Sequence, residues 1–176
     1  MIFHFLDAVK QRNVLESLSR LTSGLGQYSP TPGSDLERNA SEMLNEIRRV
    51  EKAVQAYTTA RFEYELAIAL RNYTAWYVRG EKRKKSLEEV VAHLVRSLSL
   101  DSKHHDAKCE LARIQIDEKQ VRNLPNALKL VSELKEDEAL PDWMSSLVQK
   151  AKRWSGDSEI PDDNDFSEMD PSPAVF

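Results

Sequence analysis

The stretch that decides the fold is residues 86–134, which read SLEEVVAHLVRSLSLDSKHHDAKCELARIQIDEKQVRNLPNALKLVSEL. Small and branched apolar residues recur in it at helical spacing, on both sides of a short polar joint at 101–104. This spacing is typical of stacked helical hairpins, because each helix buries one stripe against its partner and another against the next pair. We therefore expect an all-α fold whose helical units bind other proteins.

The composition of the whole chain agrees with this expectation. Of its 176 residues, 40% are hydrophobic and 31% are charged, which is typical of a soluble protein with one domain and tails. Between 34 and 155 only Gly80, Pro125 and Pro141 interrupt long runs of helix-forming residues. We expect an N-terminal helix and flexible connector over 1–33, a helical domain over 34–156 and a tail over 157–176.

Three features that the sequence lacks indicate the cellular compartment of the protein. A single cysteine excludes an internal disulfide framework and suits a reducing compartment. No apolar run approaches the length of a membrane span, and the apolar N-terminus lacks the basic region and cleavage site of a signal peptide. We expect a cytoplasmic protein that does not bind membranes.

The N-terminal half predicts long helices. Apolar spacing predicts one helix over 2–22, and Ser34 with Glu37 has the spacing of a capping box. From there, apolar residues recur at intervals of alternately four and three positions, which is a heptad spacing. The ten positions, of which only Arg61 is charged, are Leu36, Ala40, Met43, Ile47, Val50, Val54, Tyr57, Arg61, Tyr64 and Ile68. We favour one long or kinked helix over 35–79, although a break at Thr58–Thr59 would give two. Its 36–68 heptad seam is either an intramolecular core stripe or the seam of a homodimer.

Further helix boundaries follow from caps and prolines. Gly80 is expected to end the long helix, and Ser86 with Glu89 to cap a helix that ends near Ser99. Another helix is expected over 103–119. Proline is tolerated in the first turn, so Pro125 and Pro141 are each expected in the first turn of a further helix, ending near Glu136 and Gly156 respectively.

Residues 86–134 resemble the tetratricopeptide repeat family. The resemblance is carried by Val90, Leu94, Ser97, by Ala107, Leu111, Ala112, and by Ala127, Val131, Leu134. The chain departs from the family at Ser102, where proline is preferred, and in the 37-residue spacing from Val90 to Ala127, since the family repeats every ~34 residues. The resemblance implies a stack of helical hairpins and a protein-binding concave face that would include Asn72, Lys108 and Arg113.

A basic run suggests a different kind of partner. Five bases fall in seven residues, in what we expect to be an inter-helix loop: Arg79, Lys82, Arg83, Lys84 and Lys85. Such a run can contact phosphates or an acidic partner, or it can be a solvated loop that stabilises the end of the preceding helix. A nucleic-acid-associated complex subunit is therefore the alternative to a non-enzymatic adaptor or chaperone-like protein.

The sequence supplies no set of residues for catalysis. His105 and Cys109 lie four apart on a predicted helix, with His93 on the preceding one, but zinc sites need three or four ligands. We interpret Cys109 as a buried thiol beside solvated histidines. No glycine-rich phosphate loop occurs. We expect no metal, no cofactor and no enzymatic activity.

The end of the sequence is acidic. Residues 157–170 contain seven acids and no base, and without them 22 acids and 25 bases remain in the chain. We expect a disordered tail, because it has too little apolar surface to offset the entropy of ordering. The tail is either solubilising, or it folds back on the basic body, or it docks elsewhere through residues 174–176.

Overall fold

The computed structural model describes residues 2–22, 30, 35–56 and 58–156, with side chains described for all of these except 2–11, 54–56 and 156. This part of the chain is all-helical and contains no strand, as the sequence predicts. Its elements are α1 (Ile2–Thr22), α2 (Leu36–Ala56), α3 (Ala60–Tyr77), α4 (Glu81–Leu100), α5 (His105–Asp117), η1 (Lys119–Val121), α6 (Leu124–Glu136), η2 (Asp142–Met144) and α7 (Ser145–Gly156). No helix within the described ranges is both long and apolar enough to cross a membrane.

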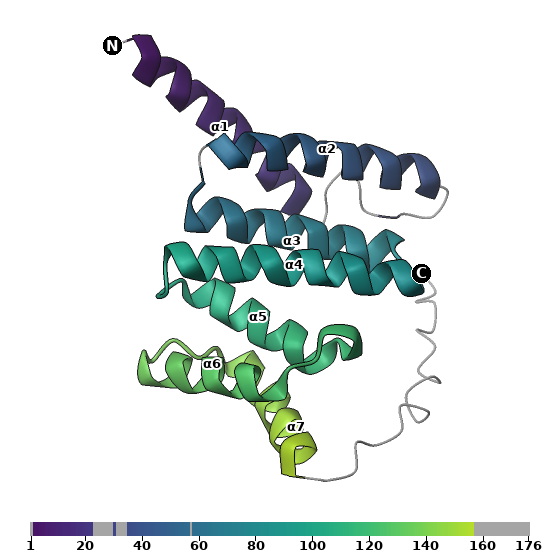
Figure 1. The fold of residues 1–176 in the computed structure, drawn as a ribbon, viewed down its shortest axis with the longest axis vertical. Coiled ribbons are helices and arrows are strands. Elements are labelled where there is room, and N and C mark those ends of the chain that lie inside the picture. The colour runs from purple at the N-terminus through teal and green to yellow at the C-terminus, as the bar shows by residue number, and fades with distance from the viewer. Residues whose placement is uncertain (1, 23–29, 31–34, 57, 157–176) are drawn as a thin grey trace, which may run out of the picture.

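The helices form an elongated stack (Figure 1). Each helix from α2 to α7 packs mainly on its neighbours in the chain, and α3 with α4 and α5 with α6 make the most extensive pairs. Helix α1 packs against both α2 and α3, while α7 also contacts α5. The stack therefore has a middle, around α3 to α5, and two ends.

One continuous core runs through this stack. All nine residues that carry the tetratricopeptide resemblance are buried: Val90, Leu94, Ser97, Ala107, Leu111, Ala112, Ala127, Val131 and Leu134. At the other end, Leu18 and Leu21 of α1 join the same cluster, each 1% exposed. Residues 12–22 therefore pack together with the domain expected over 34–156.

The predicted long helix over 35–79 is wrong, and the alternative with a break at Thr58–Thr59 is right. Helix α2 ends at Ala56, and α3 begins after Thr59, whose hydroxyl accepts a hydrogen bond from the amide of Phe62 at 3.2 Å. This capping bond favours a new helix start over continuation. Met43, Ile47 and Val50 of the heptad seam are fully buried within the single chain.

The start of α4 also differs from the prediction. Helix α4 begins at Glu81, so Ser86 lies inside it and is not a cap; its hydroxyl instead lies 2.5 Å from that of Thr74 in α3. Gly80 does not end α3, which stops at Tyr77, but precedes α4 with φ +60°, a backbone conformation that glycine adopts without strain. The loop predicted for the basic run is therefore mostly helix.

The remaining boundaries lie close to the predictions. Helices α1 and α6 match, and α5 is shorter by two residues at each end. Pro125 lies in the first turn of α6, as predicted, whereas Pro141 precedes a 3-10 turn before α7. Helix α2 is capped by Asp35, whose carboxylate accepts from the Arg38 amide at 3.0 Å. The predicted cap at Ser34, most of the connector and the acidic tail lie outside the described residues.

Candidate functional site

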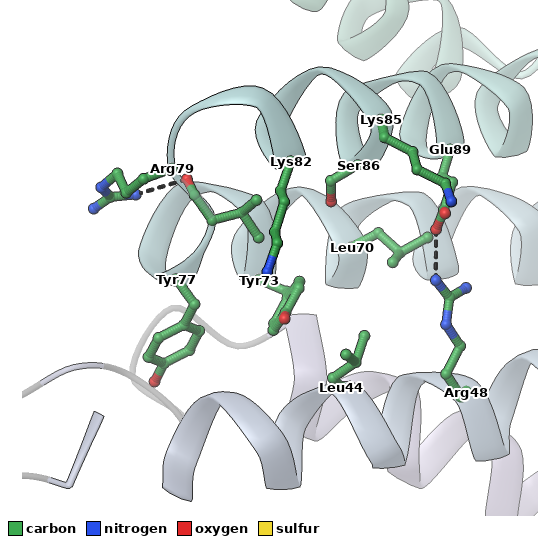
Figure 2. Close-up of a pocket in the computed structure, with 11 residues that line it drawn as sticks. Leu44, Arg48, Leu70, Tyr73, Tyr77, Arg79, Lys82, Lys85, Ser86 and Glu89 are labelled. Carbon is green, nitrogen blue, oxygen red and sulfur yellow. Dashed lines mark hydrogen bonds and ion pairs between the residues drawn. The ribbon is translucent and has the colours of Figure 1, made fainter. Parts of the chain in front are cut away.

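A pocket of about 500 Å³ opens between α2, α3 and the first half of α4 (Figure 2). Its volume is in the usual range for ligand-binding sites. The lining residues are Leu44 and Arg48 of α2, Leu70, Tyr73 and Tyr77 of α3, Val78 and Arg79 of the linker, and Lys82, Lys85, Ser86 and Glu89 of α4. Four of these side chains are cationic and one is anionic, so we call it the basic pocket.

The four cations differ in how far they are already engaged. Arg48 donates to Glu89 at 2.7 Å and to Glu51 at 2.8 Å. Arg79 donates to the carbonyl oxygens of Ala75 and Val78, at 2.9 and 3.1 Å, and so caps the end of α3. By contrast, Lys82 and Lys85 have no ion-pair or hydrogen-bond partner within the described residues. These two ammonium groups are the ones open to an external anion.

Beside the lysines the pocket has an apolar and aromatic wall. Leu70 is 1% exposed and forms its base, while the Tyr73 and Tyr77 rings lie 5.9 Å apart between their centroids. Burial raises the pKa of Tyr77 above its usual value, although a hydrogen bond with Asn39 acts in the opposite direction. In Figure 2 the Lys82 side chain extends from α4 towards Tyr73. A ligand here would meet both positive charge and apolar surface.

The helix divides the basic run between different surfaces. Arg79, Lys82 and Lys85 line the basic pocket, whereas Arg83 turns away from it, donating to Glu118 at 2.7 Å and to the Thr74 carbonyl at 3.2 Å. Lys84 is exposed and lies 4.0 Å from Glu88. The five bases therefore do not form one continuous patch. Arg79 hydrogen-bonds the end of the preceding helix, which was one of the roles expected for the run as a solvated loop.

The residues expected to bind a partner on a concave face are engaged within the chain. Asn72, 7% exposed, donates to the carbonyl oxygens of Leu21 and Thr22 at 3.5 and 3.4 Å. Lys108, 6% exposed, pairs with Glu133 at 2.9 Å, which raises the pKa of its ammonium group. Both side chains tie helices together in this structure.

Arg113 belongs to an ion-pair cluster that closes a second, smaller pocket. Arg113 and Arg71 donate to the buried carboxylate of Glu110 at 2.6 and 2.9 Å. Burial acts to raise the pKa of Glu110, but the two guanidinium groups outweigh it, so that the pKa lies below its usual value. Asn72 and Arg113 do line this pocket together, with Arg71 and Arg83. Each of the three arginines is paired with a glutamate, so this second pocket offers no unpaired cation of the kind found in the basic pocket.

His105 and Cys109 have different surroundings. His105 Nε2 lies 3.2 Å from the Asp137 carboxylate on α6, and Cys109 is buried. Desolvation, with the nearby carboxylates of Asp106 and Glu110, raises the pKa of the Cys109 thiol to about 11. No group of three or more potential ligands is placed to hold a metal ion in the described part of the chain.

Part of the basic pocket was not apparent in the sequence. The basic run pointed to Lys82 and Lys85, whereas Leu44 and Arg48 were not singled out in the sequence and Glu89 was expected only to form a capping box with Ser86. The spacing of Tyr73 and Tyr77, four apart and followed by the bases, was the available signal. Comparison of the chain with protein-family models, curated proteins and solved structures finds no match.

Proposed function

We propose that this chain is a non-enzymatic helical adaptor that binds another protein, and that the basic pocket receives part of that partner. The observation that carries the proposal is the pair of ammonium groups of Lys82 and Lys85, which have no partner in the described part of the chain and lie beside the apolar wall of Leu70 and Tyr73. An acidic segment with one aromatic or aliphatic side chain matches both features. The side chain would bury apolar area while its neighbouring carboxylates approach the lysines.

The proposal includes tetratricopeptide-like packing of residues 86–134. Burial of all nine resembling positions and the extensive contact of α5 with α6 support it. In this arrangement α3 with α4 and α5 with α6 are consecutive hairpins. The basic pocket then lies where the first hairpin meets α2.

The test is quantitative capture of proteins from an extract of the native cells on immobilised full-length chain, read out by mass spectrometry. Wild type is compared with the double variant Lys82→Glu/Lys85→Glu and with Lys129→Glu, a charge reversal at an exposed side chain of α6. We expect one or more proteins to be retained by wild type and by Lys129→Glu and lost from the double variant. The same retained set on all three would overturn the proposal.

The nucleic-acid alternative stays a prediction with its own measurement. The five bases do not form one continuous patch, and Glu89 lies among those of the basic pocket, which is a weak arrangement for following a phosphate backbone. A mobility-shift assay with RNA and DNA at low salt tests it. Binding by wild type that the double variant loses would favour the alternative over a protein partner.

A further inference from the structure

The basic pocket and one segment of the same chain have complementary chemistry. Residues 162–170 read DDNDFSEMD, in which Phe166 stands among five carboxylates and no base. The basic pocket has the opposite charge, with four cations and one carboxylate, and it also has an aromatic and aliphatic wall. The only other stretch of nine residues with five acids and no base is the overlapping 157–165, which contains no aromatic residue.

The segment follows α7 in the chain, and ion pairs connect α7 with the start of α4. Helix α7 and the first turns of α4 are linked by two ion pairs at the end of α5, Lys150–Asp117 at 3.1 Å and Arg83–Glu118 at 2.7 Å. They therefore lie within a few side-chain lengths of each other. The ten residues that separate Gly156 from Phe166 span up to about 35 Å when extended. This span is the reach available to Phe166 from the end of α7.

We propose that residues 162–170 bind the basic pocket of their own chain, with Phe166 against Leu70 and Tyr73 and the carboxylates at Lys82 and Lys85. The segment then competes with the acidic segment of a partner and regulates access to the site. This regulatory role rests on the proposed function. Weak contacts are sufficient, because a tethered segment has an effective concentration of the order of 1 mM, so that an intrinsic dissociation constant near that value already fills half of the pockets.

A second cationic surface near α7 is a poorer match for the segment. Trp154 is covered by Arg122, 4.3 Å from the ring centre, and by Lys150, 4.6 Å from it. Lys150 also pairs with Asp117. Lys150 is thus engaged by a carboxylate and Arg122 by the Trp154 ring, whereas Lys82 and Lys85 have no ion-pair or hydrogen-bond partner within the described residues.

The experiment is site-specific photocrosslinking in the full chain. Phe166→p-benzoylphenylalanine places a photoreactive ring at the proposed anchor, and mass spectrometry maps the crosslinked peptides in the monomer band. We expect crosslinks to α2, α3 or α4 at the pocket, with a yield that falls about tenfold when Lys82→Glu/Lys85→Glu is added, as for the loss of two charge contacts. Lys129→Glu should leave the yield unchanged. The same photoreactive substitution at Phe176 should give no pocket crosslink.

Three results would overturn the proposal: crosslinks at Trp154 instead of the pocket, crosslinks only between two copies, or a yield that the lysine reversals do not change. Its failure is distinguishable from failure of the proposed function. If partner capture depends on Lys82 and Lys85 but these crosslinks are absent, the proposed adaptor function stands and the binding of residues 162–170 to the pocket is rejected. If the crosslinks form but no protein is captured, the segment binds its own pocket and the proposed adaptor function is rejected. If both hold, Phe166→Ser should increase partner retention.

Discussion

His93 and Glu63 form a buried hydrogen-bonded pair that joins α4 to α3. Their exposed fractions are 3% and 5%, and His93 Nδ1 lies 2.7 Å from a carboxylate oxygen of Glu63. The Glu51 carboxylate of α2 lies 3.7 Å from the other ring nitrogen, and Arg96 Nε lies 3.4 Å from Glu63. Three helices thus meet at one imidazole ring. From sequence His93 was considered only as a metal ligand, because its partners lie 30 or more residues away.

We expect His93→Ala to lower the free energy of unfolding by about 3 kcal/mol, because it leaves the buried Glu63 carboxylate with Arg96 alone and opens a cavity. The matched control is His105→Ala, whose ring is 41% exposed and pairs with Asp137 at the surface. Its cost should stay below about 1 kcal/mol. Urea denaturation of the two variants and wild type measures both. Equal losses would show that the buried pair contributes no more than a surface contact.

At the scale of elements, Glu110 ties α5 to α3 through Arg71. The pKa of Glu110 is lowered in the folded chain, so this group stabilises the fold fully above its unfolded pKa of about 4.3, and the contribution is lost as pH falls through the folded value. Glu110→Gln should therefore cost about 2 kcal/mol near neutral pH. The difference from wild type should shrink below pH ~4. A pH series of urea denaturation measures it.

The control for this pH dependence is Glu136→Gln, an exposed carboxylate at the end of α6. It should change stability by less than about 0.5 kcal/mol at every pH. A Glu110→Gln difference that stays constant down to acid pH would contradict the prediction, because it would show that the ionised form of Glu110 is not what stabilises the fold.

Lys82 lies in the first turn of α4, where the helix dipole disfavours a cation. We expect Lys82→Glu to raise the free energy of unfolding by about 0.5 kcal/mol, since it replaces an unfavourable charge and relieves repulsion from Lys85. Lys129→Glu should instead lower it slightly, because it places a second acid beside Glu133. Thermal denaturation compares them. A destabilising Lys82→Glu would show that this lysine supports the fold and would remove the argument that it is kept for binding.

These elements show what the sequence could and could not predict. Helix α6 was predicted well because Pro125 and its apolar stripe are local signals. The start of α4 was missed because it depends on Gly80 at positive φ, and a capping-box pattern at Ser86 competed with it. The basic pocket needs α2, α3 and α4 together, so three of its four cations were predictable from the basic run, but the α2 side with Leu44 and Arg48 was not. Local chemistry fixes helices, whereas a site between helices depends on packing.

At the scale of the whole molecule, most contacts join helices that are neighbours in the chain. In such a stack the stability of each helix depends on its own contacts and those of its neighbours, so the middle is held from two sides and the ends from one. We therefore expect hydrogen exchange to be slowest in α3, α4 and α5 and faster in α1 and α7. A compact bundle with one cooperative core would instead exchange through global unfolding in all helices.

Two cavity variants separate these possibilities. Leu94 lies fully buried in α4 at the middle of the stack, and Val148 lies buried in α7 at its end. Leu94→Ala should cost about 3 kcal/mol and speed exchange in helices on both sides of α4. Val148→Ala should speed exchange in α7 and α6 while leaving α2 and α3 protected, because the loss reaches only the adjoining interface. Hydrogen exchange read by mass spectrometry resolves each helix. Uniform acceleration in both variants would contradict a stack and, with it, the tetratricopeptide-like packing on which the proposed adaptor surface depends.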